Sequence, residues 1–287
     1  MGISTVQTCY NDGVTGESCF SPVSITYQGD AATIAAKSFG DNASPLNYYA
    51  IDSDATSPSQ FDSLIPATSA SDTYSEFTIV FSLYVVDDNA GMFITGSNDS
   101  FVIYQPSNTG GGGLAFTVRD ENGYASSAFV NYTESAISLG QWHAVMITFK
   151  GDAVASPEEN LIQIMIDGTY YQNGDWDSGT AGTTNKRVPI HSGEIRVGEG
   201  SIIGYPTVPF YMGYVWSDET YLDPDTYWST FFDVSNKPKQ IGADGSGVTG
   251  SQPFSYFPDG NFTSNKGSGP NWTENGSVQD APSSPLD

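Results

Sequence analysis

Basic residues are scarce in this chain of 287 amino acids. Nine lysines and arginines stand against 33 aspartates and glutamates, which gives a formal net charge of −24. A surface with that charge repels phosphate backbones and anionic lipid headgroups. We therefore expect no nucleic-acid partner and no membrane partner, and we interpret the acidity mainly as a solvated surface.

Long apolar runs are also missing. No stretch of about 18 apolar residues occurs, so we expect no transmembrane helix. Residues 1–8 have neither a basic head nor an apolar stretch, which argues against a secretory signal peptide. The expectation is a protein that is used inside the cell that makes it or leaves that cell as part of a particle.

Cysteine is nearly absent. Cys9 and Cys19 are the only two, and they lie in a segment rich in Gly, Asn and Asp. They either close a small disulfide loop or remain free thiols in a reducing compartment, and the sequence leaves both alternatives open. Because no other cysteine exists, we expect no zinc site built on them.

Catalytic patterns are missing as well. A glucanase of an all-β fold would place alternating carboxylates on one strand face, whereas Glu194 and Glu199 are five residues apart and point to opposite faces. No Gly-x-Ser-x-Gly elbow occurs. Of the two histidines, His143 alternates with aliphatic residues and is expected to be packed or hydrogen-bonded, and His191 lies in an expected turn. We predict that the chain is not an enzyme.

Turn-forming and aromatic residues, in contrast, are plentiful. The chain holds 31 glycines and 16 prolines, and 13% of its residues are aromatic. Hydrophobic residues make up 38%, enough to build a sizeable core. Frequent turns without long amphipathic helices indicate an all-β protein.

Residues 139–150 predict the central strand. Side chains alternate across a strand, so one face would carry Trp142 and every second residue after it, and the other, strongly apolar face would begin at His143. Residues 160–168 alternate in the same way and end at Asp167-Gly168, a pair suited to a tight hairpin. Two such strands need a full sheet, and a second sheet to pack on, before their apolar faces are buried.

Other segments predict further strands and one helix. The strands are expected at residues 23–27, 32–36, 77–85, 92–94, 101–104, 114–118, 195–197 and 210–216. Residues 225–232 predict a short helix with Asp225 as its N-cap and with Tyr227, Phe231 and Phe232 facing the sheet. Short strands joined by turn residues favour a sandwich or jelly roll over a parallel sheet.

The central strands carry a resemblance. The pattern Gln-Trp-His-x-Val-x-Ile-x-Phe at residues 141–149, followed by a strand that ends in Ile-Asp-Gly, is similar to the centre of laminin-G-like, pentraxin-like and legume-lectin-like sandwiches. The resemblance covers roughly residues 71–233. It implies an all-β, concanavalin-A-like (laminin-G-like) antiparallel jelly-roll sandwich.

The C-terminal residues 236–287 differ in composition from the rest. Turn residues dominate, which by itself indicates partial disorder. Large apolar groups also occur there, and so many of them are expected to be buried against this domain or against a neighbouring subunit. They are Phe254, Tyr256, Phe257, Phe262 and Trp272.

The order of motifs in this tail resembles the end of bacteriophage structural proteins. Phe-Phe-Asp is followed by Pro238, then by the Gly-rich run 242–250, the aromatic run 254–257, and Asn265-Lys-Gly with Gly269. In those proteins a concanavalin-A-like sandwich precedes a loop-rich tail of this kind. The resemblance implies a virion protein: a head decoration, a fibre or a tail-associated protein.

Oxygen-rich turns make calcium a candidate cofactor, although none is required. Ca²⁺ takes six to eight oxygen ligands, and two runs could supply some of them. These runs hold Asp87, Asp88 and Asn89, and then Asn173, Asp175 and Asp177. The alternative is that these residues belong to solvated acidic turns.

A glycan site needs an exposed aromatic platform. Trp176 lies in an expected loop, and Tyr170 and Tyr171 lie close to it in the sequence. The alternative is that these aromatics fold back on the sheet.

Together these patterns predict an N-terminal arm with short strands at 1–70, a sandwich at 71–235 and a loop-rich C-terminal extension at 236–287. The function expected first is a bacteriophage virion protein, assembled in the host cytoplasm, that docks to other virion proteins and to its own copies through the arm and the tail aromatics. The second is a lectin-type adhesion module for a host or environmental glycan. On the first hypothesis, a chain without residues 236–287 still folds but no longer enters the particle.

Overall fold

The computed structural model describes part of the chain. The described residues are 9–11, 17–19, 49–51, 60–62, 73–74, 76–86, 91–95, 101–105, 114–119, 125–130, 137–150, 162–171, 188–189, 196–197, 210–275, 278–281 and 283–286. The chain divides into two compact units, Met1–Pro45 and Leu46–Asp287. Within the described ranges, no helix has the length and hydrophobicity needed to span a bilayer.

In the first unit the structure describes one antiparallel pair, β1 (Cys9–Asn11) with β2 (Glu17–Cys19). The register places Cys9 directly opposite Cys19. Opposed residues of an antiparallel pair have a Cα separation that a disulfide can bridge. The backbone is therefore compatible with the disulfide alternative. The strands expected at 23–27 and 32–36 lie outside the described residues.

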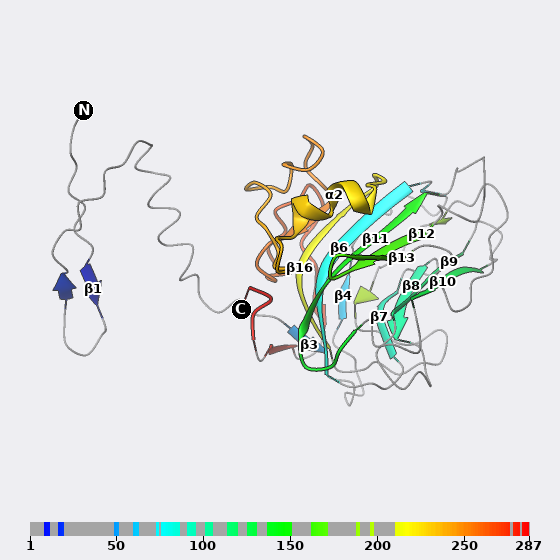
Figure 1. Cartoon of the computed structure of the whole chain (residues 1–287). Helices are drawn as coiled ribbons and strands as arrows, with labels where there is room; N and C mark the ends of the chain where they lie inside the picture. Colours follow the sequence, from blue (N-terminus) through cyan, green and yellow to red (C-terminus); the bar gives the residue numbers. More distant parts are fainter. Residues whose placement is uncertain are drawn as a thin grey trace. The chain divides into compact units, whose positions relative to one another are not determined.

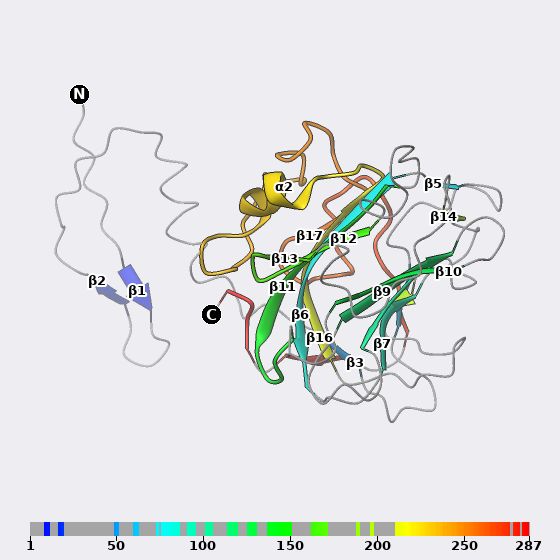
Figure 2. The same cartoon turned by 45° about the vertical axis from the view of Figure 1, so that its right-hand side comes forward.

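The second unit is a sandwich of antiparallel sheets (Figures 1 and 2). The seven-stranded sheet has the order β10 (Ala125–Val130), β9 (Leu114–Arg119), β8 (Phe101–Gln105), β7 (Gly91–Thr95), β15 (Arg196–Val197), β4 (Gln60–Asp62) and β18 (Glu274–Asn275). The eight-stranded sheet has the order β13 (Thr169–Tyr171), β12 (Ile162–Ile166), β11 (Trp142–Lys150), β6 (Glu76–Val85), β16 (Phe210–Asp218), β3 (Tyr49–Ile51) and β19 (Val278–Asp280), with β17 (Ser255–Phe257) also paired to β16. A short pair joins β5 (Thr73–Tyr74) to β14 (Val188–Pro189). The predicted all-β sandwich is confirmed.

The inner faces of the two sheets share one core. The alternation read from β6 is correct, since every second residue from Phe77 to Val85 is buried in this inner cluster. β11 pairs with β6 along its whole length, and Val145, Ile147 and Phe149 join the same core. Phe77 lies between Phe149 and Phe116, with ring centroids 5.4 and 5.8 Å away. The register follows from burial, because a slip by one residue would turn every core side chain outward.

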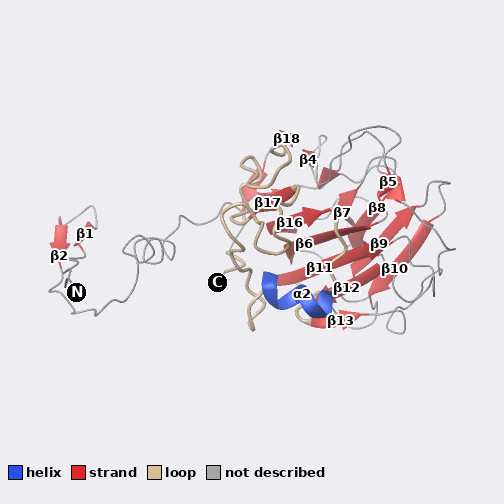
Figure 3. Ribbon diagram, turned by 90° about the horizontal axis from the view of Figure 1, so that it is seen from above, coloured by secondary structure: helices blue, strands red, loops and turns tan. Residues whose placement is uncertain are grey.

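Much of the outer face of the eight-stranded sheet is buried as well, so the expectation of a single strongly apolar face was wrong for β11. Ala144 and Met146 pack with Trp216 in a second, outer cluster. This outer cluster is covered by α2 (Pro224–Phe231) and by residues of the C-terminal extension. Figure 3 shows α2 alongside β11 and β12. Alternation alone could not reveal a cover supplied by a distant part of the chain.

The helix α2 begins one residue earlier than expected and has a different cap. Asp223, not Asp225, is the N-cap, and its Oδ1 accepts a hydrogen bond of 2.9 Å from the N–H of Thr226. Pro224 follows at the first helical position, where its fixed φ suits the helix and its missing N–H costs nothing. The predicted facing is confirmed for Phe231 and Phe232, which are fully buried in the outer cluster.

The C-terminal extension is part of the sandwich. β18 pairs with β4, and β19 pairs with β3, so segments 49–51 and 60–62, expected to precede the sandwich, also belong to its sheets. The tail aromatics are buried within the same chain: Phe257, Phe262 and Trp272 lie in the inner cluster and Tyr256 in the outer one, each at most 2% exposed. Their expected role in docking to neighbouring subunits is therefore corrected. Phe254 is half-buried.

Asn265 organises the loops of the extension. Its Oδ1 accepts hydrogen bonds from the N–H groups of Tyr256 and Gly267, at 2.8 and 2.9 Å. Its Nδ2 donates to the carbonyls of Phe254, Gly269 and Pro270. A side-chain amide with all of these bonds replaces the ladder that regular structure would provide. This explains how a segment so rich in turn residues is ordered.

Glycine is required where the extension meets the sheet. Gly245 has φ +80°, and its carbonyl accepts a bond from the Trp216 indole. A Cβ there would lie 2.8 Å from the Tyr256 ring, whereas at Gly250, with φ +82°, it would meet nothing within 4 Å. Both positions impose the same backbone strain on alanine. Only Gly245 adds a steric clash with a buried ring.

We expect Gly245→Ala to lower the free energy of unfolding by about 1–3 kcal/mol more than Gly250→Ala, because overpacking adds to the strain that both share. Urea unfolding of the two variants measures the difference. Equal losses would mean that the Tyr256 ring moves aside at no cost.

Candidate functional site

Most of the glycan-binding and calcium-binding residues predicted from the sequence lie outside the described residues: Trp176, Asp87, Asp88, Asn89, Asn173, Asp175 and Asp177. The calcium site and the Trp176 platform therefore stay predictions. Among the residues that the structure does describe, no group of three or more His, Cys, Asp or Glu side chains could hold a metal ion.

Tyr170 and Tyr171 belong to β13. Tyr170 packs against the outer cluster, and its hydroxyl accepts a hydrogen bond of 2.6 Å from Gln163 Nε2. Burial raises the pKa of Tyr170 to about 12. Gln163 Oε1 in turn accepts from the Tyr221 hydroxyl. For Tyr170 the structure supports the alternative of an aromatic folded back on the sheet.

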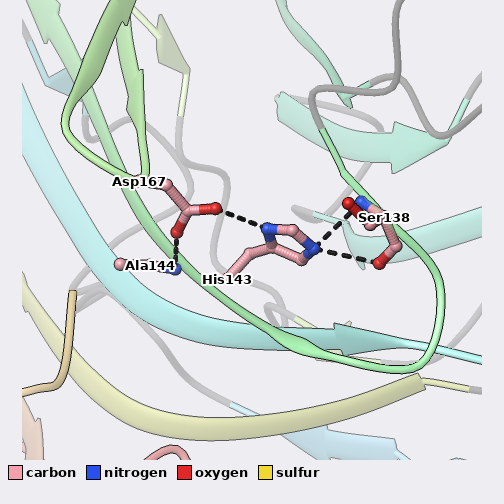
Figure 4. A network of polar contacts seen from close by, with 4 residues as sticks. All are labelled: Ser138, His143, Ala144 and Asp167. Atoms are coloured by element: carbon pink, nitrogen blue, oxygen red, sulfur yellow. Dashed lines mark hydrogen bonds and ion pairs between the residues drawn. The ribbon is translucent and has the colours of Figure 1, made fainter. Parts of the chain in front are cut away.

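His143 sits in a network that joins β11 to the hairpin after β12 (Figure 4). Its Nδ1 lies 2.6 Å from Asp167 Oδ2, and Asp167 Oδ1 accepts a 2.8 Å bond from the N–H of Ala144. Ser138 presents both its N–H and its carbonyl at 2.9 Å from Nε2, so this nitrogen has a partner whether or not it carries a proton. The bonds tie strand to turn, which confirms His143 as a packed, hydrogen-bonded residue.

Replacing Asp167 with alanine is expected to lower the free energy of unfolding by about 2–4 kcal/mol. The change removes the carboxylate that pairs with the Ala144 N–H and with Nδ1 of the buried His143, and it places alanine at φ 50°. Asn tolerates that backbone and retains an acceptor for Ala144, so Asp167→Asn should cost about 1 kcal/mol. Chemical denaturation measures the free energy of unfolding of both variants. An Asp167→Ala variant as stable as wild type would show that the Asp167 hydrogen bonds do not stabilise the fold.

The outer face of the eight-stranded sheet also carries an aromatic row, formed by Trp142, Tyr84 and Tyr211. In the strand register Tyr84 of β6 lies opposite Trp142 of β11 on one side and opposite Tyr211 of β16 on the other. The Tyr84 ring centroid is 5.5 Å from each of its two neighbours, in edge-to-face geometry. All three side chains are half-buried. The sheet therefore presents three adjoining rings whose outer parts meet solvent.

The surroundings of the aromatic row are apolar and partly exposed. Val86 at the end of β6 and Leu139 before β11 are 44% and 45% exposed. The N–H of Gly140 donates to the carbonyl of Val85, which holds these two segments together beside Tyr84. Burial raises the pKa of Tyr211, and Tyr84 raises it further. The Tyr211 hydroxyl consequently remains protonated at neutral pH and can donate a hydrogen bond.

Residues 283–286, here called the C-terminal strap, reach the aromatic row. The Trp142 indole N–H donates to the carbonyl and the hydroxyl of Ser283, at 3.2 and 3.1 Å. Lys237 Nζ donates to the Leu286 carbonyl at 2.8 Å. In Figures 1 and 2 the end of the chain, in red, lies on the side of the sheet that also carries α2. The strap thus runs along the outer face between Trp142 and the turn after α2.

Sequence reasoning named the strands of the aromatic row but not the row itself. Trp142 was assigned to the face that the structure finds outermost, and Tyr84 and Tyr211 lie within predicted strands. Their adjacency depends on the order β11–β6–β16 and on register. The available signal was a large aromatic at the outward position near one end of each strand.

Comparison with known proteins places the fold. No protein-family model matches the chain, and no curated protein matches its sequence. Among solved structures the chain is similar to a candidate carbohydrate-binding protein from Bacteroides ovatus, with a TM-score of 0.53 and 15% identity over 85% of this chain and 62% of that one. A SAP-like pentraxin from Limulus polyphemus matches with a TM-score of 0.41 and 11% identity, over 64% of this chain and 82% of that one.

A third similar structure is the carbohydrate-binding module of a Ruminococcus gnavus sialidase, with a TM-score of 0.36 and 13% identity over 55% of this chain and 83% of that one. At such identities the likeness concerns the fold. The antiparallel topology and the Bacteroides ovatus structure together define the fold class, a concanavalin-A-like jelly-roll sandwich.

Proposed function

We propose that this chain is a non-catalytic adhesion module that binds a carbohydrate on its aromatic row. The observation that carries the proposal is the set of three half-buried rings, Trp142, Tyr84 and Tyr211, in register across neighbouring strands. Sugar rings expose C–H groups on their faces and hydroxyls at their edges. The faces of the aromatic rings can pack against the C–H groups, and the indole N–H and phenol hydroxyls can form hydrogen bonds with the sugar hydroxyls.

The charge of the chain selects among glycans. With a net charge of −24, a sulfated, phosphorylated or sialylated chain would be repelled, so the expected ligand is an uncharged glycan. The rings lie on paired strands of one sheet, so little conformational entropy of the protein is lost when a ligand binds. The Bacteroides ovatus protein, a candidate carbohydrate binder by name, has the same class of fold.

A glycan array of neutral and anionic structures, followed by calorimetry on the hits, tests this function. We expect binding in the micromolar to millimolar range to neutral glycans, without release of reducing sugar. Binding should persist after chelation, because the aromatic row needs no cofactor; loss on chelation would instead support the candidate calcium ligands. A chain that binds no neutral glycan would overturn the proposal.

The setting that we propose is the surface of a bacteriophage particle, with other virion proteins and further copies of the chain as partners. The support is the order of motifs in the extension, which resembles the end of phage structural proteins. Gold-labelled antibody against the protein on purified virions tests this setting. Label on heads or tails is the expected result, and unlabelled particles beside a positive lysate would leave an adhesion module without a virion.

A further inference from the structure

We propose that the C-terminal strap is a built-in competitor of the aromatic row, so that a glycan binds by displacing it. This inference rests on the proposed function. It assigns to residues 283–286 a regulatory role at the site and defines the chemistry that the ligand must bring.

The strap occupies the hydrogen-bond donor that a sugar hydroxyl would use. The Trp142 indole N–H is shared between the carbonyl and the hydroxyl of Ser283, at 3.2 and 3.1 Å. A shared N–H at these lengths is weaker than a single short bond. A ligand that offers one well-aligned hydroxyl oxygen therefore exchanges this contact at little cost.

The rest of the strap is partly buried. Pro285 is buried, whereas Leu286 next to it is 47% exposed. The Leu286 N–H donates to Ser284 Oγ at 3.0 Å, which gives the strap a local turn. The strap therefore has a buried proline between Ser283 and Leu286, whose carbonyls accept the bonds from Trp142 and Lys237.

Lys237 supplies the tether at the other end. Its Nζ donates to the Leu286 carbonyl at 2.8 Å, while Asp233 Oδ1 accepts from the Lys237 N–H at 3.0 Å and so holds the tethering residue at the turn after α2. Lys239, two residues on, donates its Nζ to the Ser229 carbonyl of α2 at 2.6 Å. The chain thus offers two lysines with the same kind of bond, of which Lys237 holds the strap and Lys239 holds α2.

The affinity measured for a glycan is the intrinsic affinity reduced by the fraction of molecules with the strap open. The bond that the Lys237 ammonium donates to the strap lowers that fraction by about 5- to 30-fold. Removing the tether should therefore increase affinity without any new contact to the glycan.

The test uses the full chain, with Lys237→Met to release the tether and Lys239→Met as the matched control. Calorimetry with a neutral glycan hit should give about 5- to 30-fold tighter binding for Lys237→Met and an unchanged affinity for Lys239→Met. In NMR spectra, the indole N–H signal of Trp142 can be assigned by its loss in Trp142→Phe. This signal should shift when glycan is added, and it should already be shifted in Lys237→Met without glycan.

Deletion of residues 283–287 removes the strap altogether and should also increase the affinity for the glycan. Affinities unchanged in both Lys237→Met and the deletion would overturn the strap proposal and leave the proposed function standing. Absence of binding in every form would overturn the proposed function and this inference with it. Tighter binding by Lys237→Met, together with a shifted Trp142 signal, supports the proposal that the strap competes with the glycan.

Discussion

A chain that stops at residue 235 is expected not to fold. Truncation removes β17, β18 and β19, and it takes Phe257, Phe262 and Trp272 out of the inner cluster. These three rings pack on one another, with centroids 4.6 Å apart for Phe257 and Trp272 and 4.8 Å for Phe262 and Trp272. Loss of one buried Phe or Trp costs about 3–5 kcal/mol, against a total stability of roughly 5–15 kcal/mol. The composition of the tail had favoured the opposite outcome, a sandwich that folds without it.

Near-ultraviolet circular dichroism and urea unfolding measure this result. A chain that ends at Ala281 is the matched control, because it retains all three strands, and it should unfold cooperatively with nearly the stability of the full chain. A cooperative transition in the chain that ends at residue 235 would show that the extension is an accessory to the sandwich.

Replacing Tyr84 with alanine is expected to lower the affinity for a neutral glycan by roughly 10- to 100-fold, or to abolish measurable binding. Tyr84 is the middle ring of the aromatic row and contacts both Trp142 and Tyr211. The change removes a binding surface and also the packing that orients its two neighbours. A buried ring contact of this kind contributes about 1.5–3 kcal/mol, where 1.4 kcal/mol is a factor of ten.

Tyr84→Phe is the control for the ring itself. It preserves the edge-to-face packing and loses only a hydroxyl, so its affinity should fall by less than about tenfold. Calorimetry gives both affinities, and urea unfolding verifies that the two variants remain folded. Wild-type affinity in Tyr84→Ala would place the glycan elsewhere on the chain.

The strands could be predicted because burial leaves a two-residue period in the sequence. The alternation from Phe77 to Val85 and the tight hairpin at Asp167-Gly168 are found as expected. β10 (Ala125–Val130) was missed because its sequence, Ala-Ser-Ser-Ala-Phe-Val, lacks that period. The outer cluster was missed for a different reason: Trp216 and Met146 face outward from their sheet, and what buries them comes from the extension and α2.

The site was less predictable than the fold. A loop tryptophan, Trp176, attracted the glycan prediction because loops are where platforms are usually exposed. The aromatic row is made by strand residues, each of which is an outward aromatic near one end of its own strand. Only register brings Trp142, Tyr84 and Tyr211 together, and register is a property of pairs of strands.

The pairing of the last strands with the first ones of the sandwich governs when the protein can mature. β3 gains its second neighbour only when β19 has been synthesised, and β4 only when β18 has been synthesised. Neither sheet is therefore complete until synthesis has passed Asp280. Folding of the sandwich is therefore finished only after the ribosome has delivered residues 274–280. Products that end before these strands leave the backbone N–H and C=O groups of β3 and β4 unpaired on one side, which exposes a strand edge to pairing with other chains.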